Sequence, residues 1–216
     1  MIMRSPLSRR AMLRVSTGLA LVSALSSTIG LAGCSVLNNA NTPLPLYDLK
    51  PQVDLPADLP KVQWQLVVAQ PNTSADLDTT RIALRRSGNI TEYFASAAWT
   101  DNVPNLVQSK LIEAFDQSGR VAVGRDVASL VPDYVLQIEL WDFQAEYGGP
   151  VAGAHIRMTA KLVRMSDRKI VDTIAAENKA QSSGTDMQQV VAAFDKALGP
   201  VLAQIVVSTL KAVPAG

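Results

Sequence analysis

The sequence predicts an α+β fold in which a mostly antiparallel sheet carries two helices packed on one face, giving two layers. Two observations lead to this prediction. Several stretches alternate apolar and polar residues, as half-buried strands do, and two others place apolar residues at helical spacing. Elements that each have one apolar face pack most simply as helices over a sheet. We expect one such domain over residues 46–216, which is long enough for a well-buried core.

The first predicted strands are short. Residues 46–49 and residues 62–69 each have the composition of a strand. Residues 81–86 and 90–94 are expected to pair as a hairpin, because the Ser-Gly-Asn sequence at 87–89 between them is typical of a turn.

The two predicted helices occupy residues 102–118 and 186–211. The first has Pro104 near its start, where proline is tolerated, and Gly119 directly after its end. The second carries a longer apolar stripe, with Pro200 near its middle. This proline favours either a kink or a split into two helices.

Four strands are predicted between the helices. A short one covers residues 120–124, and the longest covers residues 132–147. Residues 154–162 alternate as a half-buried strand, and residues 168–176 return beside them after a turn at 166–167.

The aromatic residues near the end of the longest predicted strand allow two interpretations. Strict alternation puts Trp141, Phe143 and Tyr147 on the face opposite the aliphatic residues that precede them, Leu136, Ile138 and Leu140. In one interpretation they form a docking surface, since contiguous exposed apolar area usually serves an interaction. In the other, a β-bulge near Trp141, or a small second layer from the proline-rich segment, returns them to the core.

The residue types needed for catalysis are scarce. One histidine and one cysteine cannot form an internal disulfide or a zinc site of the usual ligand type, and neither a glycine-rich phosphate loop nor a G-x-S-x-G motif occurs. His155 falls on the polar face of its strand, where we expect a solvated residue and not a catalytic base. Glu139 and Asp142 are expected on opposite faces, so no acid pair is predicted. The sequence therefore predicts no enzyme, no cofactor and no metal site.

The balance of charge also limits the class of partner. The chain has 20 Lys and Arg residues against 19 Asp and Glu residues. A nucleic-acid-binding domain would be expected to carry a basic excess, so no nucleic-acid partner is predicted.

The N-terminus has the pattern of an export signal. Residues 4–14 contain arginines and no acid, an apolar stretch follows, and Leu31-Ala32-Gly33-Cys34 ends it. These last four residues resemble the bacterial lipobox, in which the chain is cut before a cysteine that carries diacylglycerol and often a further acyl chain such as palmitate. We expect residues 1–33 to be the signal peptide, with cleavage between Gly33 and Cys34. Two adjacent arginines leave both the general secretory and the twin-arginine route open.

Cys34 is thus the expected membrane anchor. Two or three acyl chains hold a protein stably, whereas one holds it only marginally. Residues 34–45 are rich in Asn, Thr and Pro and are expected to form a flexible tether. Ser35 follows the cysteine, where an aspartate would resemble an inner-membrane retention signal. We therefore expect the protein to be anchored on the periplasmic side of the outer membrane.

Taken in order, these segments resemble the ABC-type transport auxiliary lipoprotein family, the small periplasmic lipoproteins that accompany MCE-protein lipid transporters. Besides the lipobox, the resemblance rests on the segments 46–49, 81–84, 93–99, 111–120, 133–136 and 197–202. Pro200 departs from the uninterrupted closing helix that is usual in the family.

The resemblance implies a non-enzymatic subunit of a transporter for lipids or other hydrophobic compounds. Its implied partners are an MCE protein that bridges the periplasm, a permease and an ATPase, and a homo-oligomer is left open. The alternatives are an outer-membrane assembly lipoprotein, of the secretin-pilot or lipopolysaccharide-assembly type, and a periplasmic hydrolase. The lack of a nucleophile–base pair argues against the hydrolase.

Replacing Cys34 by alanine tests the anchor. The Cys34→Ala variant has no thiol to carry lipid, so cell fractionation should recover the protein away from the membranes. If the variant still sediments with the outer membrane and is processed after Gly33, the anchor has been assigned to the wrong residue.

Overall fold

The computed structural model describes residues 43–86, 90–125, 131–147 and 151–213. The predicted signal peptide, Cys34 and the predicted turn at 87–89 lie outside the described residues. In chain order the elements are β1 (Leu46–Tyr47), β2 (Gln65–Val68), β3 (Asn72–Thr73), β4 (Arg81–Arg85), β5 (Thr91–Trp99), α1 (Val103–Ser118), β6 (Ala122–Gly124), β7 (Tyr134–Tyr147), β8 (Ala152–Arg164), β9 (Lys169–Gln181) and α2 (Met187–Ala212).

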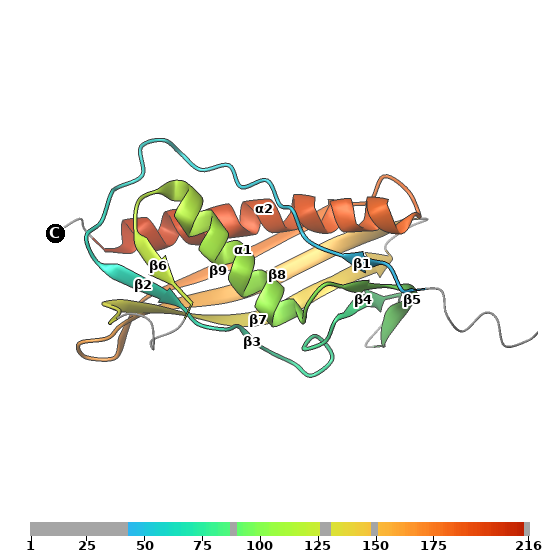
Figure 1. Cartoon of the computed structure of the whole chain (residues 1–216), viewed down its shortest axis with the longest axis horizontal. Helices are drawn as coiled ribbons and strands as arrows, with labels where there is room; N and C mark the ends of the chain where they lie inside the picture. Colours follow the sequence, from blue (N-terminus) through green and yellow to red (C-terminus); the bar gives the residue numbers. More distant parts are fainter. Residues whose placement is uncertain (1–42, 87–89, 126–130, 148–150, 214–216) are drawn as a thin grey trace, which may run out of the picture. The chain divides into compact units, whose positions relative to one another are not determined.

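The described strands form one mixed sheet, drawn in Figure 1. Its largest part is an antiparallel meander of the three longest strands, β7, β8 and β9. The other edge of β7 is bordered in turn by β2, β3 and β4, all parallel to it, and β4 pairs with β5 in the predicted hairpin. The predicted α+β class with a mostly antiparallel sheet is therefore confirmed.

Helix α2 contacts β8 and β9, and α1 contacts α2, β2 and β6. In Figure 1, α2 (red) runs along the meander with α1 (green) beside it. Among the described residues, α2 is the one helix that length and composition would allow to span a membrane. Most of it is buried against the rest of the fold, as in a core helix. The finer expectation of two layers, with both helices on one face, stays a prediction.

Most predicted elements are present, with shifted ends. Helix α1 stops before Gly119, as predicted, and this glycine has the left-handed φ of 61° that ends many helices. The predicted strand 62–69 is reduced to β2, and the predicted strand 168–176 extends to Gln181 in β9.

Helix α2 continues through Pro200 without a break. A proline inside a helix deprives the carbonyl four residues earlier of its backbone donor, here that of Lys196. The side-chain amide Nδ2 of Asn178 on β9 lies 3.5 Å from this carbonyl oxygen and 3.3 Å from that of Ala197. A strand side chain thus supplies a donor near the gap, and of the two outcomes predicted for Pro200 the split into two helices is wrong.

The register of β7 against β8 shifts between Leu140 and Asp142, so that Trp141 is an extra residue in a β-bulge. Beyond the bulge Phe143 lies opposite Ile156, on the core side of the sheet. Phe143 is 0% exposed, whereas Trp141 is 51% exposed. The predicted bulge is therefore confirmed, and it returns Phe143 to the core but leaves Trp141 exposed.

Phe143 belongs to an aromatic cluster in the core. Its ring centroid lies 6.0 Å from that of Trp99 and 5.2 Å from that of Phe194. Tyr147 is partly buried and packs against the same core. Phe143 is therefore removed from the predicted docking surface, because the extra residue turns its side chain to the inner face, and Trp141 is its most exposed member.

Truncation of the two aromatics should separate their roles. Phe143→Ala removes a fully buried ring, and we expect it to lower the free energy of unfolding by roughly 3–5 kcal/mol. Trp141→Ala, at an exposed position, should cost about 1 kcal/mol or less. Urea denaturation of both variants measures the difference, and equal losses would contradict the described bulge.

Candidate functional site

The candidate site is a group of charged and amide side chains on the face of the meander that points away from Phe143. We call it the polar-face network. Strand β7 contributes Asp142, Gln144 and Glu146, and the other strands contribute Arg157 and His155 from β8, Glu177 and Lys179 from β9, and Arg85 from β4.

The bulge brings the acids of β7 together. Because Trp141 is an extra residue, Asp142 and Glu146 lie on the same face of the sheet as Glu139. The expectation that Glu139 and Asp142 point to opposite faces is therefore wrong. The sequence carries a signal of this change, since the apolar alternation that ends at Leu140 resumes out of phase at Phe143.

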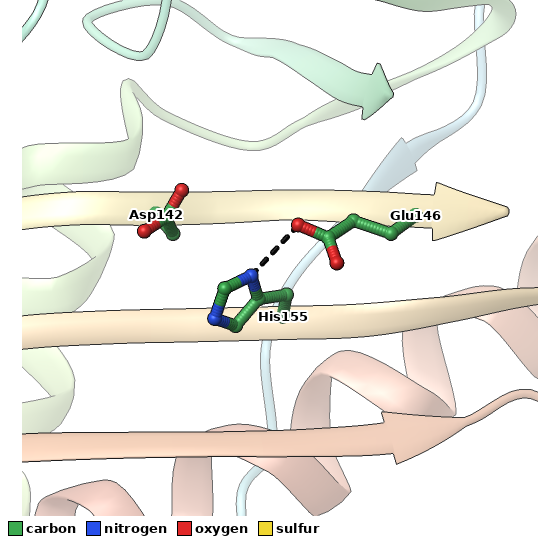
Figure 2. A group of neighbouring side chains, drawn as sticks. All are labelled: Asp142, Glu146 and His155. Atoms are coloured by element: carbon green, nitrogen blue, oxygen red, sulfur yellow. Dashed lines mark hydrogen bonds and ion pairs between the residues drawn. The ribbon is translucent and has the colours of Figure 1, made fainter. Parts of the chain in front are cut away.

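His155 lies at the centre of the network, between two carboxylates from the neighbouring strands. Its Nδ1 is 2.7 Å from Glu146 Oε1, the contact drawn in Figure 2. Its Nε2 is 2.8 Å from Glu177 Oε1. The residue is on the polar face of its strand, as predicted, but it is only 8% exposed. The expectation of a solvated histidine is wrong, because the paired side chains around it exclude water.

Asp142 is the second buried centre of the network. Its Oδ1 accepts hydrogen bonds from Arg85 Nη1 and Gln144 Nε2, both at 3.0 Å. Its Oδ2 accepts from Arg157 Nε at 2.6 Å. A buried carboxylate is tolerated when cationic donors compensate for the lost hydration, and two guanidinium groups do so here.

The pKa values of both β7 acids reflect these contacts. Burial would raise the pKa of Asp142, but hydrogen bonds from Gln144 and Arg157 outweigh it and hold the pKa below its ordinary 3.8. Burial likewise opposes the charge on Glu146, while hydrogen bonds from His155 and its other donors keep the pKa below its ordinary 4.5. Both groups are therefore carboxylates at neutral pH.

Asp142, Glu146 and His155 offer ligand atoms within 4.8 Å of one another, a spacing at which side chains can share a metal ion. However, the oxygens of both carboxylates already accept hydrogen bonds from arginine, lysine, histidine and glutamine donors. A metal ion would have to displace these donors and lie beside several positive side chains. The arrangement therefore fits a closed ion-pair network better than a metal centre.

Trp141 stands beside this network, between two shallow clefts. Its Nε1 donates a hydrogen bond to Thr159 Oγ1 at 3.1 Å, which fixes the ring against β8. One cleft, of about 350 Å³, is lined by Trp141, Arg157, Thr159 and Glu177 together with Ala175. The other, of about 280 Å³, lies toward β3 and Glu139. The bulge thus presents a half-exposed aromatic ring next to ordered charged groups.

Two larger open clefts were not predicted from the sequence. One, of about 700 Å³, lies beside Gln108 and Arg125, and the other, of about 760 Å³, lies beside Trp64 and Tyr134. Their lining residues come from segments that are distant in the sequence. Local periodicity gives no signal for such neighbours.

The lowered pKa values predict acid sensitivity of the fold. The pKa of Glu146 is lower in the folded than in the unfolded chain, so its contribution to stability is present above about pH 4.5. That contribution is lost as the pH falls through the folded-state pKa. In Glu146→Gln, which cannot titrate, the free energy of unfolding should therefore fall less steeply with acid than in the unmodified protein.

Urea denaturation across the acidic range measures these slopes. Glu113→Gln, a substitution of the same kind at an exposed position of α1, is the matched control. Burial raises the pKa of Asp195, so its contribution to stability changes with pH in the opposite direction to that of Glu146. Asp195 is unchanged in all the proteins compared, so it does not affect the difference between their slopes. Equal acid slopes in the two variants would contradict the stabilising role of Glu146.

Comparison with known proteins gives matches over most of the chain. A model of the family described as ABC-type transport auxiliary lipoprotein component matches residues 47–206. The uncharacterized protein bll6063 of Bradyrhizobium diazoefficiens is 26% identical over 186 residues, which are 85% of this chain and 50% of that protein. The chain thus spans about half the length of this curated relative.

Solved structures agree with the fold. The crystal structure of protein XCC0632 from Xanthomonas campestris matches with a TM-score of 0.72 and 31% identity, covering 77% of this chain and 95% of that chain. A structure of an uncharacterized protein, with a TM-score of 0.56 and 14% identity over 74% of this chain and 97% of that one, shows likeness of fold alone. Because the family model matches residues 47–206, which are most of the chain, the chain belongs to the family of ABC-type transport auxiliary lipoprotein components.

Proposed function

We propose that this chain is a lipid-anchored, non-catalytic subunit of a transporter that moves lipids or other hydrophobic compounds between the inner and outer membranes. Membership of a family of auxiliary transport lipoproteins is the observation that carries the proposal. An auxiliary component is consistent with a role that involves no catalysis of its own. The proposed partners are an MCE protein in the periplasm and, through it, a permease and an ATPase.

The proposed position in the cell follows from the N-terminus. Cys34 of the lipobox-like segment would carry the lipid, and residues 34–45 would link it to the domain that begins at residue 46. The absence of aspartate after Cys34 supports the periplasmic side of the outer membrane. From there the domain would act on an inner-membrane transporter through contacts across the periplasm.

We further propose that Trp141 is the centre of the docking surface. A tryptophan is among the residues that supply most energy at interface centres, because it buries a large rigid ring and keeps one hydrogen-bond donor. At Trp141 the bond to Thr159 already fixes the ring, so little side-chain freedom would be lost on binding. Arg157, which is half exposed, and Glu177 would provide a polar rim beside it.

Co-purification of the protein with the MCE protein from detergent-solubilised envelopes tests this proposal. Truncating a central interface residue costs about 2 kcal/mol or more. Trp141→Ala should therefore weaken binding by at least about tenfold, since each 1.4 kcal/mol is a factor of ten.

Ile170→Ala is the matched control, because Ile170 on β9 is 55% exposed, close to the value for Trp141. It should leave co-purification unchanged. Normal binding by Trp141→Ala would remove this residue from the docking surface, and failure of the unmodified protein to bind an MCE protein would refute the proposed partner.

A further inference from the structure

We propose that protonation of His155 controls the shape of the surface around Trp141, through the contact between His155 and Glu177. This regulation of the docking surface rests on the proposed function for its biological meaning. The coupling between the three residues does not depend on it.

The first step concerns the hydrogens on the imidazole ring. Both ring nitrogens of His155 lie within 2.8 Å of carboxylate oxygens, which accept hydrogen bonds and do not donate them. Two such contacts need a hydrogen on each nitrogen, and only the positively charged imidazolium has both. When the ring is neutral, one nitrogen turns a lone pair toward a carboxylate, and that contact becomes repulsive.

The second step identifies which contact is lost. Glu146 keeps Lys179 Nζ at 3.0 Å and Gln144 Nε2 at 2.9 Å as further donors when His155 becomes neutral. Within the described part of the chain, the charged partner found for Glu177 is His155 alone, and the side chain of Glu177 is 51% exposed. Glu177 can therefore turn to water at little cost, so the remaining ring hydrogen stays with Glu146.

The groups around His155 come from every adjoining element. Strand β7 contributes Asp142 and Glu146, and the remaining charged groups are Arg157 on β8, Glu177 and Lys179 on β9, and Arg85 on β4. Asp142 is bound to the two arginines and Glu146 to the lysine. The permanent positive charges are thus already engaged elsewhere, and Glu177 is the carboxylate whose placement depends on the histidine proton.

The third step links this contact to the surface. Glu177 and Trp141 line the same shallow cleft, together with Arg157 and Thr159. Thr159 also accepts the hydrogen bond from the indole of Trp141. Movement of Glu177 toward water therefore changes one wall of the cleft against which the Trp141 ring lies. Histidine is the side chain that ordinarily changes charge near neutral pH, so the change would follow the pH around the protein.

Nuclear magnetic resonance tests the coupling directly. His155 is the one histidine of the chain, so its ring nitrogen signals are assigned without ambiguity. A titration that follows these signals from about pH 5 upward should show an imidazolium with hydrogens on both nitrogens at the acidic end, since both nitrogens face carboxylate oxygens. As the ring loses one hydrogen, the indole signal of Trp141 should shift over the same pH interval.

Two variants make the result specific. In Glu177→Gln the charged contact is absent, so the pH-dependent shift of the Trp141 indole should be lost. Glu113→Gln on α1, which is exposed to a similar degree, should retain it. A neutral ring at the acidic end, or an indole signal that does not follow the histidine, would overturn the proposal.

Binding to the MCE protein supplies the functional readout. Across the same pH interval the affinity of the unmodified protein should change several-fold, and that of Glu177→Gln should stay constant. If the indole follows the histidine but no MCE protein binds at any pH, the coupling stands and the proposed partner is wrong. If the partner binds equally well at both ends of the interval, the regulatory proposal is wrong.

Discussion

One extra residue in β7 determines both faces of the meander. By adding Trp141 to the strand, the bulge shifts every following side chain of β7 to the other face. Phe143 thereby enters the core against Trp99 and Phe194, while Asp142 joins the polar face. Without the extra residue, the phenylalanine would lie among the charges and the aspartate in the apolar core. The buried aromatic cluster and the polar-face network therefore depend on the same irregularity.

The polar-face network is stable because each buried carboxylate has several donors, more than because of any single ion pair. Burying a charge is costly unless donors replace its hydration, and removing one partner leaves the other uncompensated. Asp142 has donors from three strands, β4, β7 and β8, and Glu146 has donors from β7, β8 and β9. These bonds cross the strands whose backbone pairing forms the meander. Asp142 and Glu146 are thus held in place by several donors each, on the polar face that also carries the exposed ring of Trp141.

Much of the fold could be predicted from the sequence because its signals are local. Helical spacing ending at Gly119 and the alternation in β8 depend on neighbouring residues and are present as expected. The parallel partners of β7 could not be predicted, since short strands do not carry the identity of a distant partner. Continuity of α2 through Pro200 likewise depends on Asn178 from another element. At the site, alternation predicts the face of His155 correctly. Its burial depends on Glu177 from β9 and on Glu146, whose face is set by the change of phase at Trp141 that strict alternation ignores.

In the proposed function, Trp141 is the residue at which the domain contacts its partner. The most direct measurement is photo-crosslinking in living cells, with a photoreactive amino acid introduced at position 141 or, for comparison, at position 170. We expect a crosslink to the MCE protein from position 141 and none from position 170. Crosslinks from position 170 alone, or to another class of envelope protein from position 141, would contradict it.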